Sequence, residues 1–377
     1  MKTINSLFLL FVLCIFPYSA KAGASQSANS NNSKNILMVV SGYGVDQGET
    51  LPGYEFDEFS KAYLIFKANG LSVDIASPNG GKVVADKYNP EKPFNAQVLQ
   101  DKAVMTKLEK TLKISDLKAD DYAGIFVVGG KGAMFDLPKD KSLQKLIAKV
   151  YENNGSISAV CHGPAALVDV KLSNGQYLVS GKRVNGFTNQ EEKAFGKKWV
   201  KHFDFMLEDK LAERGGKFES SSLMLPHATV DGRLITGQNP FSTARVAESF
   251  VKSLGISLIE RESFKDDRTM YLVERLLRDE KGAKIEFLKH SEKYQPELIG
   301  MYGYYALQFA ENNKQIDQAV NLMQLASPIM KNPQLDMFIA QGQLKLGKTS
   351  DAKTTLQQII EANPEMEAAR KMLDTIN

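Results

Sequence analysis

Cys161 and His162 are adjacent residues whose chemistry depends on the turn in which they lie. The apolar run 156–160 ends at this pair, and the small residues and proline of 163–165 follow directly. A buried strand that turns sharply at a nucleophile and enters a helix is a nucleophile elbow. The positive end of the helix dipole favours a thiolate there. An isolated Cys-His pair is more often an inert buried cysteine, but this context favours a reactive thiol at Cys161.

The cysteine content draws attention to the same position. The chain has two cysteines, Cys14 and Cys161, and Cys14 lies in an apolar N-terminal stretch. Loss of this stretch would leave one thiol and no internal disulfide. A lone cysteine in an oxidising compartment is a liability unless it is buried or used.

The N-terminus has the pattern of a secretory signal peptide. Lys2 precedes an apolar stretch over residues 7–17, and the Ala-Lys-Ala of 20–22 fits the small-x-small cleavage rule. The apolar stretch is about half of the ~20 residues needed to span a bilayer, which argues against an uncleaved anchor. We expect a signal peptide over residues 1–22 and a flexible Ser/Asn-rich tether over residues 23–34. The protein is then exported, periplasmic or secreted, without stable membrane insertion.

Apolar runs and amphipathic segments alternate along residues 35–258. The run 35–40 is apolar throughout, as in a strand buried on both faces, whereas the aromatic residues of 54–69 recur with the helical period. This alternation predicts an α/β fold with a mostly parallel sheet, and functional residues at the carboxyl ends of its strands. The expected strands are 35–40, 72–76, 123–128, 156–160, 228–230 and 234–236, and the expected helices are 54–69, 143–151, 203–214 and 242–254.

The composition changes near residue 259, and no strand pattern follows. A similar spacing of an alanine and an Asn-Pro pair occurs twice, over 319–333 and 352–364, and the second copy resembles a tetratricopeptide repeat. Fewer repeats are present than the roughly three of a stable solenoid. We therefore expect an α/β domain over 35–258 that folds without the rest, and an all-α, tetratricopeptide-like appendix over 259–377.

Five segments carry a family resemblance, which covers about residues 35–258. They are VDIASPNGG at 73–81, GGKGAMFDLP at 129–138, AVCHGP at 159–164, GFTNQEE at 186–192 and DGRLITGQNP at 231–240. Together they resemble the ThiJ/PfpI superfamily (class I glutamine amidotransferase-like), in particular its branch of heat-shock chaperones and glyoxalase III enzymes. The resemblance implies a flavodoxin-like sandwich with a nucleophile elbow.

The resemblance also implies roles for individual side chains. Cys161 is expected as the nucleophile and His162 as the adjacent catalytic histidine. The acid toward which His162 is directed is Glu192 by position, with Glu191 as the fallback. A glutamate on the helix after the first strand approaches the thiol in this family, and the matching position is Glu58. Without the resemblance, Glu58 fits a solvated helix residue, and Glu192 fits an acid that complements a helix dipole.

Two positions depart from the family pattern. A histidine usually follows the two glycines of the glycine-rich loop, where this chain has Lys131. A proline usually follows the glutamate of the first helix, where this chain has Ala62. Lys131 leaves the backbone donors intact but changes the charge over the pocket, so it affects the expected substrate more than the expected fold.

The resemblance implies a cofactor-independent, glyoxalase III-like lyase (D-lactate dehydratase type) that protects against stress by converting methylglyoxal or related dicarbonyls to hydroxy acids. Cys161 is expected to add to an aldehyde, and backbone N–H groups at Gly130, Lys131 and His162 to hold the oxyanion. Glu58 is expected to move a proton between adjacent carbons and to share a proton with Cys161, whose pKa is lowered.

Two other functions fit the same sequence. A PfpI-type cysteine amidase or peptidase would use Cys161, His162 and Glu192 as a triad and would not need Glu58. A stress chaperone would bind its clients through the C-terminal helices and would need a groove there.

Composition limits the partners. The formal net charge is +3, and no basic run interleaves with aromatic residues, which argues against nucleic acid. His202, His227 and His290 lack metal-ligand spacing, and the glycine-rich loops match neither a P-loop nor a dinucleotide fingerprint. We expect a small dicarbonyl substrate, no metal and no cofactor. A protein partner at the C-terminal helices and a homodimer stay open.

The leader is open to a direct test. Protein from the periplasmic or secreted fraction should begin at Gly23, because signal peptidase cleaves after the small-x-small pattern. N-terminal sequencing measures this, with the cytosolic fraction as the control. Recovery of Met1 on most of the protein, in the cytosol, would contradict export.

Overall fold

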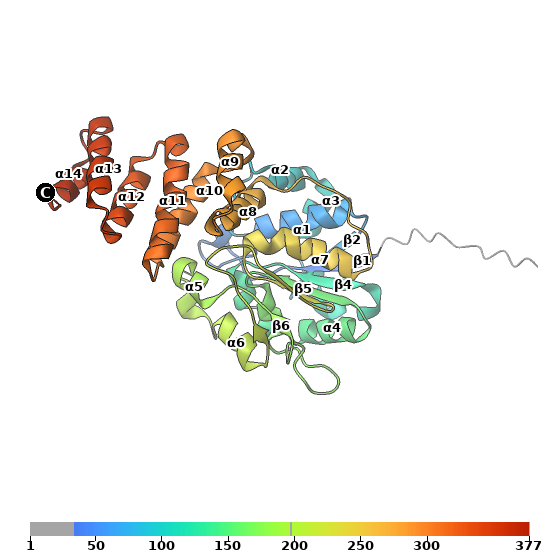
Figure 1. The fold of residues 1–377 in the computed structure, drawn as a ribbon. Helices are drawn as coiled ribbons and strands as arrows, with labels where there is room; N and C mark the ends of the chain where they lie inside the picture. The colour runs from blue at the N-terminus through green and yellow to red at the C-terminus, as the bar shows by residue number, and fades with distance from the viewer. Residues whose placement is uncertain (1–33, 197, 377) are drawn as a thin grey trace, which may run out of the picture. The chain divides into compact units, whose positions relative to one another are not determined.

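The computed structural model describes residues 34–196 and 198–376 (Figure 1). The expected signal peptide, and all but the last residue of the expected tether, lie outside the described residues. Among the helices of the described ranges, none is both long and apolar enough to cross a bilayer.

The core of the structure is a seven-stranded sheet with the strand order β3-β2-β1-β4-β5-β9-β8. All neighbouring strands pair in parallel except β8 and β9, which are antiparallel. A separate parallel pair is formed by β6 and β7. The strands are β1 (Asn35–Val39), β2 (Ser72–Ser77), β3 (Leu112–Lys113), β4 (Gly124–Val127), β5 (Ser156–Val160), β6 (Arg183–Val184), β7 (Lys217–Phe218), β8 (Ala228–Asp231) and β9 (Leu234–Gly237). The predicted α/β fold with a mostly parallel sheet is confirmed.

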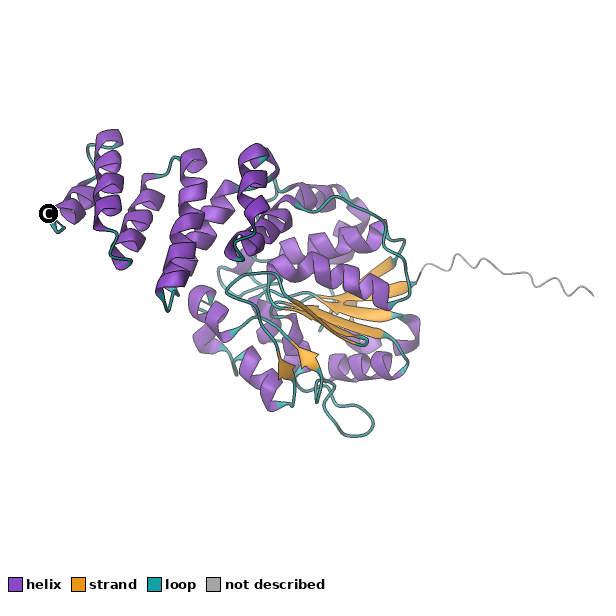
Figure 2. Cartoon of the chain, in the orientation of Figure 1, coloured by secondary structure: helices purple, strands orange, loops and turns teal. Residues whose placement is uncertain are grey.

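Helices cover both faces of this sheet (Figures 1 and 2). On one face α1 and α7 lie side by side, and the rings of Phe66, Phe126 and Phe250 meet there with centroids 5.2–6.2 Å apart. On the other face α4 packs against β4 and β5. The helices of this region are α1 (Phe56–Ala68), α2 (Pro93–Gln100), α3 (Lys102–Glu109), α4 (Lys141–Glu152), α5 (Asn189–Phe195), α6 (Leu207–Glu213) and α7 (Thr243–Ser253).

Three helices differ from those that the sequence predicted. We did not predict α2, although Pro93 stands at its first position, or α3, whose first turn is capped by the side chain of Asp101. Both are only eight residues long, so their periodic pattern is weak. The helix expected over 203–214 begins four residues later, at Leu207.

The strand register places the chemistry at one edge. Val39 of β1 pairs with Val127 of β4, and Val127 pairs with Ala159 of β5. The segments that follow these strands therefore leave the sheet side by side. The glycine-rich loop after β4 and Cys161 after β5 meet there, as expected for the carboxyl edge of a parallel sheet.

The C-terminal part is entirely helical in the described residues, as predicted. From α10 onward each helix packs against the next along the chain. One apolar cluster, which includes Met270, Phe287 and Met323, joins α8 to α12 and takes in Leu225 of the α/β region. The helices are α8 (Lys265–Leu277), α9 (Lys281–Lys289), α10 (Pro296–Gln308), α11 (Asn313–Met330), α12 (Pro333–Lys345), α13 (Thr349–Ala362) and α14 (Glu367–Asp374), which we call the helical extension.

A buried ion pair joins the helical extension to the α/β region. The ammonium of Lys61 on α1 lies 2.7 Å from Asp266 and 2.6 Å from Asp267, both on α8. Burial alone would lower the pKa of Lys61, but the charges of Asp267 and Asp266 raise it above its ordinary value. The boundary at residue 258 stays a prediction. A fragment that ends there lacks both partners of Lys61, so we expect it to be less stable than the full chain.

The ion pair predicts a selective loss of stability. Lys61→Met leaves two buried carboxylates without their cation and should lower the free energy of unfolding by about 3–5 kcal/mol. The matched control is Lys67→Met on the same helix, because Lys67 is 59% exposed in its pair with Asp101 and should contribute less than about 1 kcal/mol. Urea denaturation at neutral pH measures both. Equal losses in the two variants would contradict the role of the buried pair.

Candidate active site

Cys161 lies in a strained turn at the end of β5. Its φ is 59°, in the left-handed region that residues with a side chain rarely adopt. Gly163 keeps the turn tight, since a Cβ there would lie 2.6 Å from the carbonyl oxygen of Val127. Only 4% of Cys161 is exposed, although it lines a pocket. The geometry is that of a nucleophile elbow.

The helix after Cys161 is shorter than expected. It is a five-residue 3₁₀ helix over Gly163–Leu167. So few aligned peptide units give a weak dipole, so the expected stabilisation of a thiolate is small. The predicted lowering of the Cys161 pKa by this dipole is therefore not supported.

His162 bridges the thiol and an acid. Its Nδ1 lies 3.3 Å from Sγ of Cys161, and its Nε2 lies 2.6 Å from a carboxylate oxygen of Glu192. Both His162 and Glu192 are almost fully buried, and the imidazole packs on the ring of Phe187 with centroids 4.5 Å apart. This arrangement holds the imidazole in one orientation, with Nδ1 directed at the sulfur.

Glu191, the fallback acid, faces a different environment. One of its oxygens accepts 2.9 Å hydrogen bonds from the Met224 N–H and from the side-chain amides of Gln238 and Asn239. The other accepts from the N–H and the hydroxyl of Thr188, as part of a capping box at the start of α5. Burial raises the pKa of Glu191 despite these donors. The hydrogen bonds of Glu191 join three segments, at the start of α5, at Met224 and at residues 238–239. The structure brings Glu192 to His162 instead.

Glu58 approaches the thiol from α1 and has no exposed surface. One carboxyl oxygen accepts a 2.7 Å hydrogen bond from the N–H of Gly129. The carboxyl lies close enough to Cys161 for each group to affect the pKa of the other. Position 129 must be glycine, because a Cβ would lie 2.7 Å from the Glu58 carboxyl and 2.8 Å from the Cys161 Cβ. The structure therefore gathers Cys161, His162 and Glu58 at one point.

The electrostatics of this buried pair corrects the sequence-based expectation for the thiol. Burial raises the pKa of Cys161 well above its ordinary value, Glu58 raises it further, and Lys131 opposes the shift. Burial and then the charge of Glu55 likewise raise the pKa of Glu58. Glu58 disfavours ionisation of the thiol, whereas the thiol, as a hydrogen-bond donor, partly offsets the raised pKa of Glu58. The pair therefore keeps at least one proton near neutral pH. The thiol pKa is thus raised where the sequence predicted a lowered one.

The pocket over the thiol has a volume of about 270 Å³. The backbone groups expected to hold an oxyanion, at Gly130, Lys131 and His162, belong to residues that line it. In the described part of the chain, no backbone carbonyl accepts a hydrogen bond from Gly130 or His162. The volume suits a small substrate. The lining residues are Glu55, Asp86, Gly130, Lys131, Cys161, His162, Phe187, Phe195, Met224 and Pro240.

Sequence reasoning missed two acids of this pocket, Glu55 and Asp86. Burial raises the pKa of Glu55 to about 7, so this carboxyl exchanges its proton near neutral pH. Burial also raises the pKa of Asp86, against the effect of a hydrogen bond from Gly53 and the charge of Lys131. Glu55 lies three residues before Glu58, which is about one helical turn, and this spacing could have identified it.

The fold and the site define an α/β protein with a buried cysteine at a nucleophile-elbow turn, and comparison with known proteins identifies its family. The model of the DJ-1/PfpI family matches residues 50–253. The chain belongs to this family.

Three relatives indicate the branch. Glutathione-independent glyoxalase hsp3102 of Schizosaccharomyces pombe is 34% identical, over 59% of this chain and 98% of that protein. Glutathione-independent glyoxalase HSP31 of Saccharomyces cerevisiae is 35% identical, with the same coverage of each. The crystal structure of glyoxalase III from Candida albicans superposes with a TM-score of 0.54 and 26% identity, and covers 58% of this chain and 97% of that chain. The helical extension lies beyond the family match.

The two adjacent glutamates predict opposite mutant phenotypes. Glu192→Gln should lower turnover about tenfold or more with little change in stability, because it weakens the orientation of His162, and His162→Ala should lose more. Glu191→Gln should instead lower stability by about 1–3 kcal/mol, since an amide cannot accept from all of the donors around it. Turnover and thermal unfolding of each variant measure this. A silent Glu192→Gln beside an inactive, stable Glu191→Gln would reverse the assignment.

Proposed function

We propose that this chain is a glyoxalase III-like lyase that converts methylglyoxal or a related small dicarbonyl to a hydroxy acid without glutathione. The observation that carries the proposal is the buried carboxyl of Glu58 against the thiol of Cys161, opposite His162. A proton transfer between adjacent carbons needs such a carboxyl beside the reacting atoms. The names of the glyoxalase relatives support the same reaction.

The first half of the reaction forms a covalent adduct. His162 accepts the thiol proton at Nδ1, and the sulfur of Cys161 adds to the aldehyde carbon to give a hemithioacetal. Its oxygen carries the developing negative charge, which backbone N–H groups at Gly130 and His162 can stabilise. The ammonium of Lys131, on the pocket wall, adds a positive charge to the same space.

The second half moves one proton and adds one water. Glu58 removes the proton from the former aldehyde carbon while the imidazolium of His162 gives the thiol proton to the neighbouring carbonyl oxygen, which forms an enediol. Glu58 then returns its proton to the carbon that carries that oxygen, which leaves a thioester of the hydroxy acid and both bases in their starting states. Water then cleaves the thioester and regenerates the thiol. Overall, methylglyoxal plus water gives lactate, so the reaction uses no external oxidant or reductant.

A cysteine amidase or peptidase is a weaker candidate. The contacts of Cys161, His162 and Glu192 also suit amide cleavage through a thioester. That reaction leaves the buried Glu58 without a role. A pocket of about 270 Å³ is also small for a peptide.

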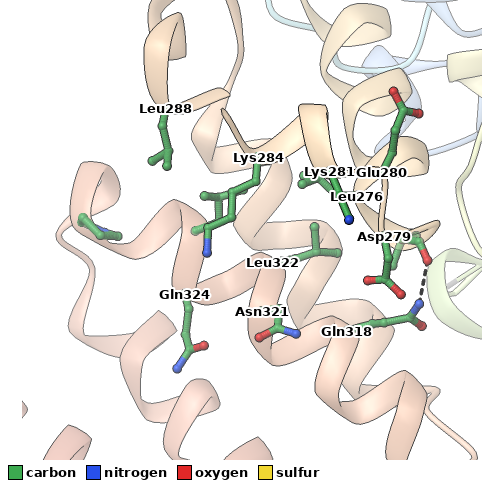
Figure 3. A pocket seen from close by; sticks show the side chains of 13 residues that line it. Leu276, Asp279, Glu280, Lys281, Lys284, Leu288, Gln318, Asn321, Leu322 and Gln324 are labelled. Carbon is green, nitrogen blue, oxygen red and sulfur yellow. Dashed lines mark hydrogen bonds between the residues drawn. The ribbon is translucent and has the colours of Figure 1, made fainter. Parts of the chain in front are cut away.

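One feature supports a binding role for the helical extension as a second function. A groove of about 560 Å³ lies among α8, α9 and α11 (Figure 3). Leu276, Leu288 and Leu322 line it together with Lys281 and Lys284. Binding of clients there is the chaperone alternative, and we keep it as a secondary proposal.

The placement of the protein is also a proposal. Export to the periplasm or to the medium rests on the N-terminal sequence pattern, and a tetratricopeptide-like character of the extension rests on the repeated Asn-Pro spacing. A protein partner and a homodimer stay predictions.

A glutathione-free assay tests the proposed reaction. Full-length protein should form lactate from methylglyoxal, Cys161→Ser should form none, and Glu58→Gln should lose at least about 100-fold because an amide cannot transfer the proton. Iodoacetamide should still alkylate Cys161 in Glu58→Gln. The alkylation rate should rise at a lower pH than in the wild type, because the Glu58 carboxyl, which raises the pKa of the Cys161 thiol, is gone. Full lactate formation by Glu58→Gln would exclude this mechanism.

A further inference from the structure

Helix α1 is held from outside by the helical extension. Lys61 follows Glu58 by three residues, one turn further along α1, and only 2% of its side chain is exposed. Its ammonium contacts Asp266 and Asp267 of α8, and it lies 5.0 Å from the ring centre of Phe94 and 5.6 Å from that of Phe264. The carboxyl of Glu58 on the same helix is fixed at the thiol by the Gly129 N–H. Small movements of α1 therefore change both contacts together.

Helix α5 is supported in a similar way. Phe195, near the end of α5, lines the pocket over the thiol. Its ring packs edge-on against Tyr305 of α10, with centroids 4.7 Å apart. Tyr304 contacts Tyr305 and also Phe338 of α12, at 5.0 Å and 4.3 Å. An aromatic chain thus runs from the helical extension to the pocket wall.

Both supports come from residues beyond the family match, which ends at residue 253. The two helices they hold carry Glu58 and Glu192. The cluster around Lys61 is directional, since two carboxylates and two rings fix one ammonium position. The contact of Phe195 with Tyr305 is apolar and fixes the position of the wall.

We propose that the helical extension is a structural part of the active site: α8 positions Glu58 through Lys61, and α10 positions the pocket wall through Tyr305 and Phe195. Asp266, Asp267 and Tyr305 are then positioning residues that act through others. The tests of this proposal by kcat and KM rest on the proposed function. The tests by alkylation of Cys161 do not.

The first test displaces α1 in the full-length protein. Asp267→Asn leaves Asp266 as the only anion for Lys61. It should lower kcat about tenfold with KM unchanged, because Glu58 is misplaced for proton transfer. The thiol is faced by Glu58 from α1, Glu55 before α1, Lys131 after β4 and its neighbour His162. When Glu58 lies further from the thiol, it raises the thiol pKa less. The rate of alkylation of Cys161 by iodoacetamide should therefore rise at a lower pH than in the wild type.

The control for charge is Glu280→Gln. Glu280 lies between α8 and α9 and pairs with Arg275 inside the extension, at 2.8 Å. The variant removes one negative charge but leaves α1 untouched. It should retain the wild-type kcat and the wild-type alkylation profile.

The second test loosens the pocket wall. Tyr305→Ala should raise KM about fivefold or more with a smaller change in kcat, since the wall positions substrate and does not transfer protons. It should also accelerate alkylation of Cys161 by a bulky maleimide. Tyr305→Phe keeps the ring and should restore both values to those of the wild type.

The outcomes separate the two proposals. If the wild type turns over no dicarbonyl but the alkylation changes appear, the proposed function fails and the role of the extension stands. If the wild type is active and both folded variants match it in kinetics and alkylation, the extension has no part in the site. Should Asp267→Asn not fold, the Tyr305→Ala and Tyr305→Phe pair decides alone, and equal maleimide rates overturn the proposal.

Discussion

The proposed chemistry of this protein depends on one juxtaposition, of the carboxyl of Glu58 and the thiol of Cys161, which both lie against Gly129. Both groups lie away from water, and burial raises the pKa of each. Glu58 raises the pKa of the thiol further, whereas a hydrogen bond from Cys161 lowers that of Glu58 without offsetting its burial. Because two negative charges cannot be accommodated there without a large electrostatic cost, the site keeps a proton available. A reaction that relocates a hydrogen between carbons needs such a shared proton. His162 contacts the sulfur through Nδ1, so in the proposed reaction addition and proton transfer use different bases.

The backbone around this contact leaves little freedom. Gly129 supplies the N–H that fixes Glu58, and it passes so close to Cys161 that a side chain cannot be accommodated. Parallel strands β4 and β5 bring that glycine and the cysteine to the same edge of the sheet. The strand register therefore positions the thiol and the loop that binds the Glu58 carboxyl. The position of α1 and of the pocket wall also involves contacts with the helical extension, through Lys61 and Phe195.

The sequence was informative where chemistry and local pattern coincide. The apolar run before Cys161 and the small residues after it predicted the elbow, and alternation of strands and helices predicted the sheet. The adjacent glutamates were harder. Thr188 stands three residues before Glu191, a capping-box spacing that assigns Glu191 to the helix start and leaves Glu192 for His162. The pairing of Lys61 with α8 could not be predicted, because nothing local links residues about two hundred positions apart. The direction of the thiol pKa was missed because burial, a tertiary property, outweighs a short helix.

The backbone conformation at Cys161 is unfavourable for stability but is the one that presents the thiol at the turn. A residue with a side chain at a φ of 59° costs of order 1–3 kcal/mol, and glycine would adopt this conformation freely. The residue proposed as the nucleophile is therefore one that stability alone would replace with glycine. Replacement of Cys161 by glycine would relieve this strain and keep the fold, but it would remove the thiol. A related chain with glycine at this position would therefore be well folded and without the proposed activity.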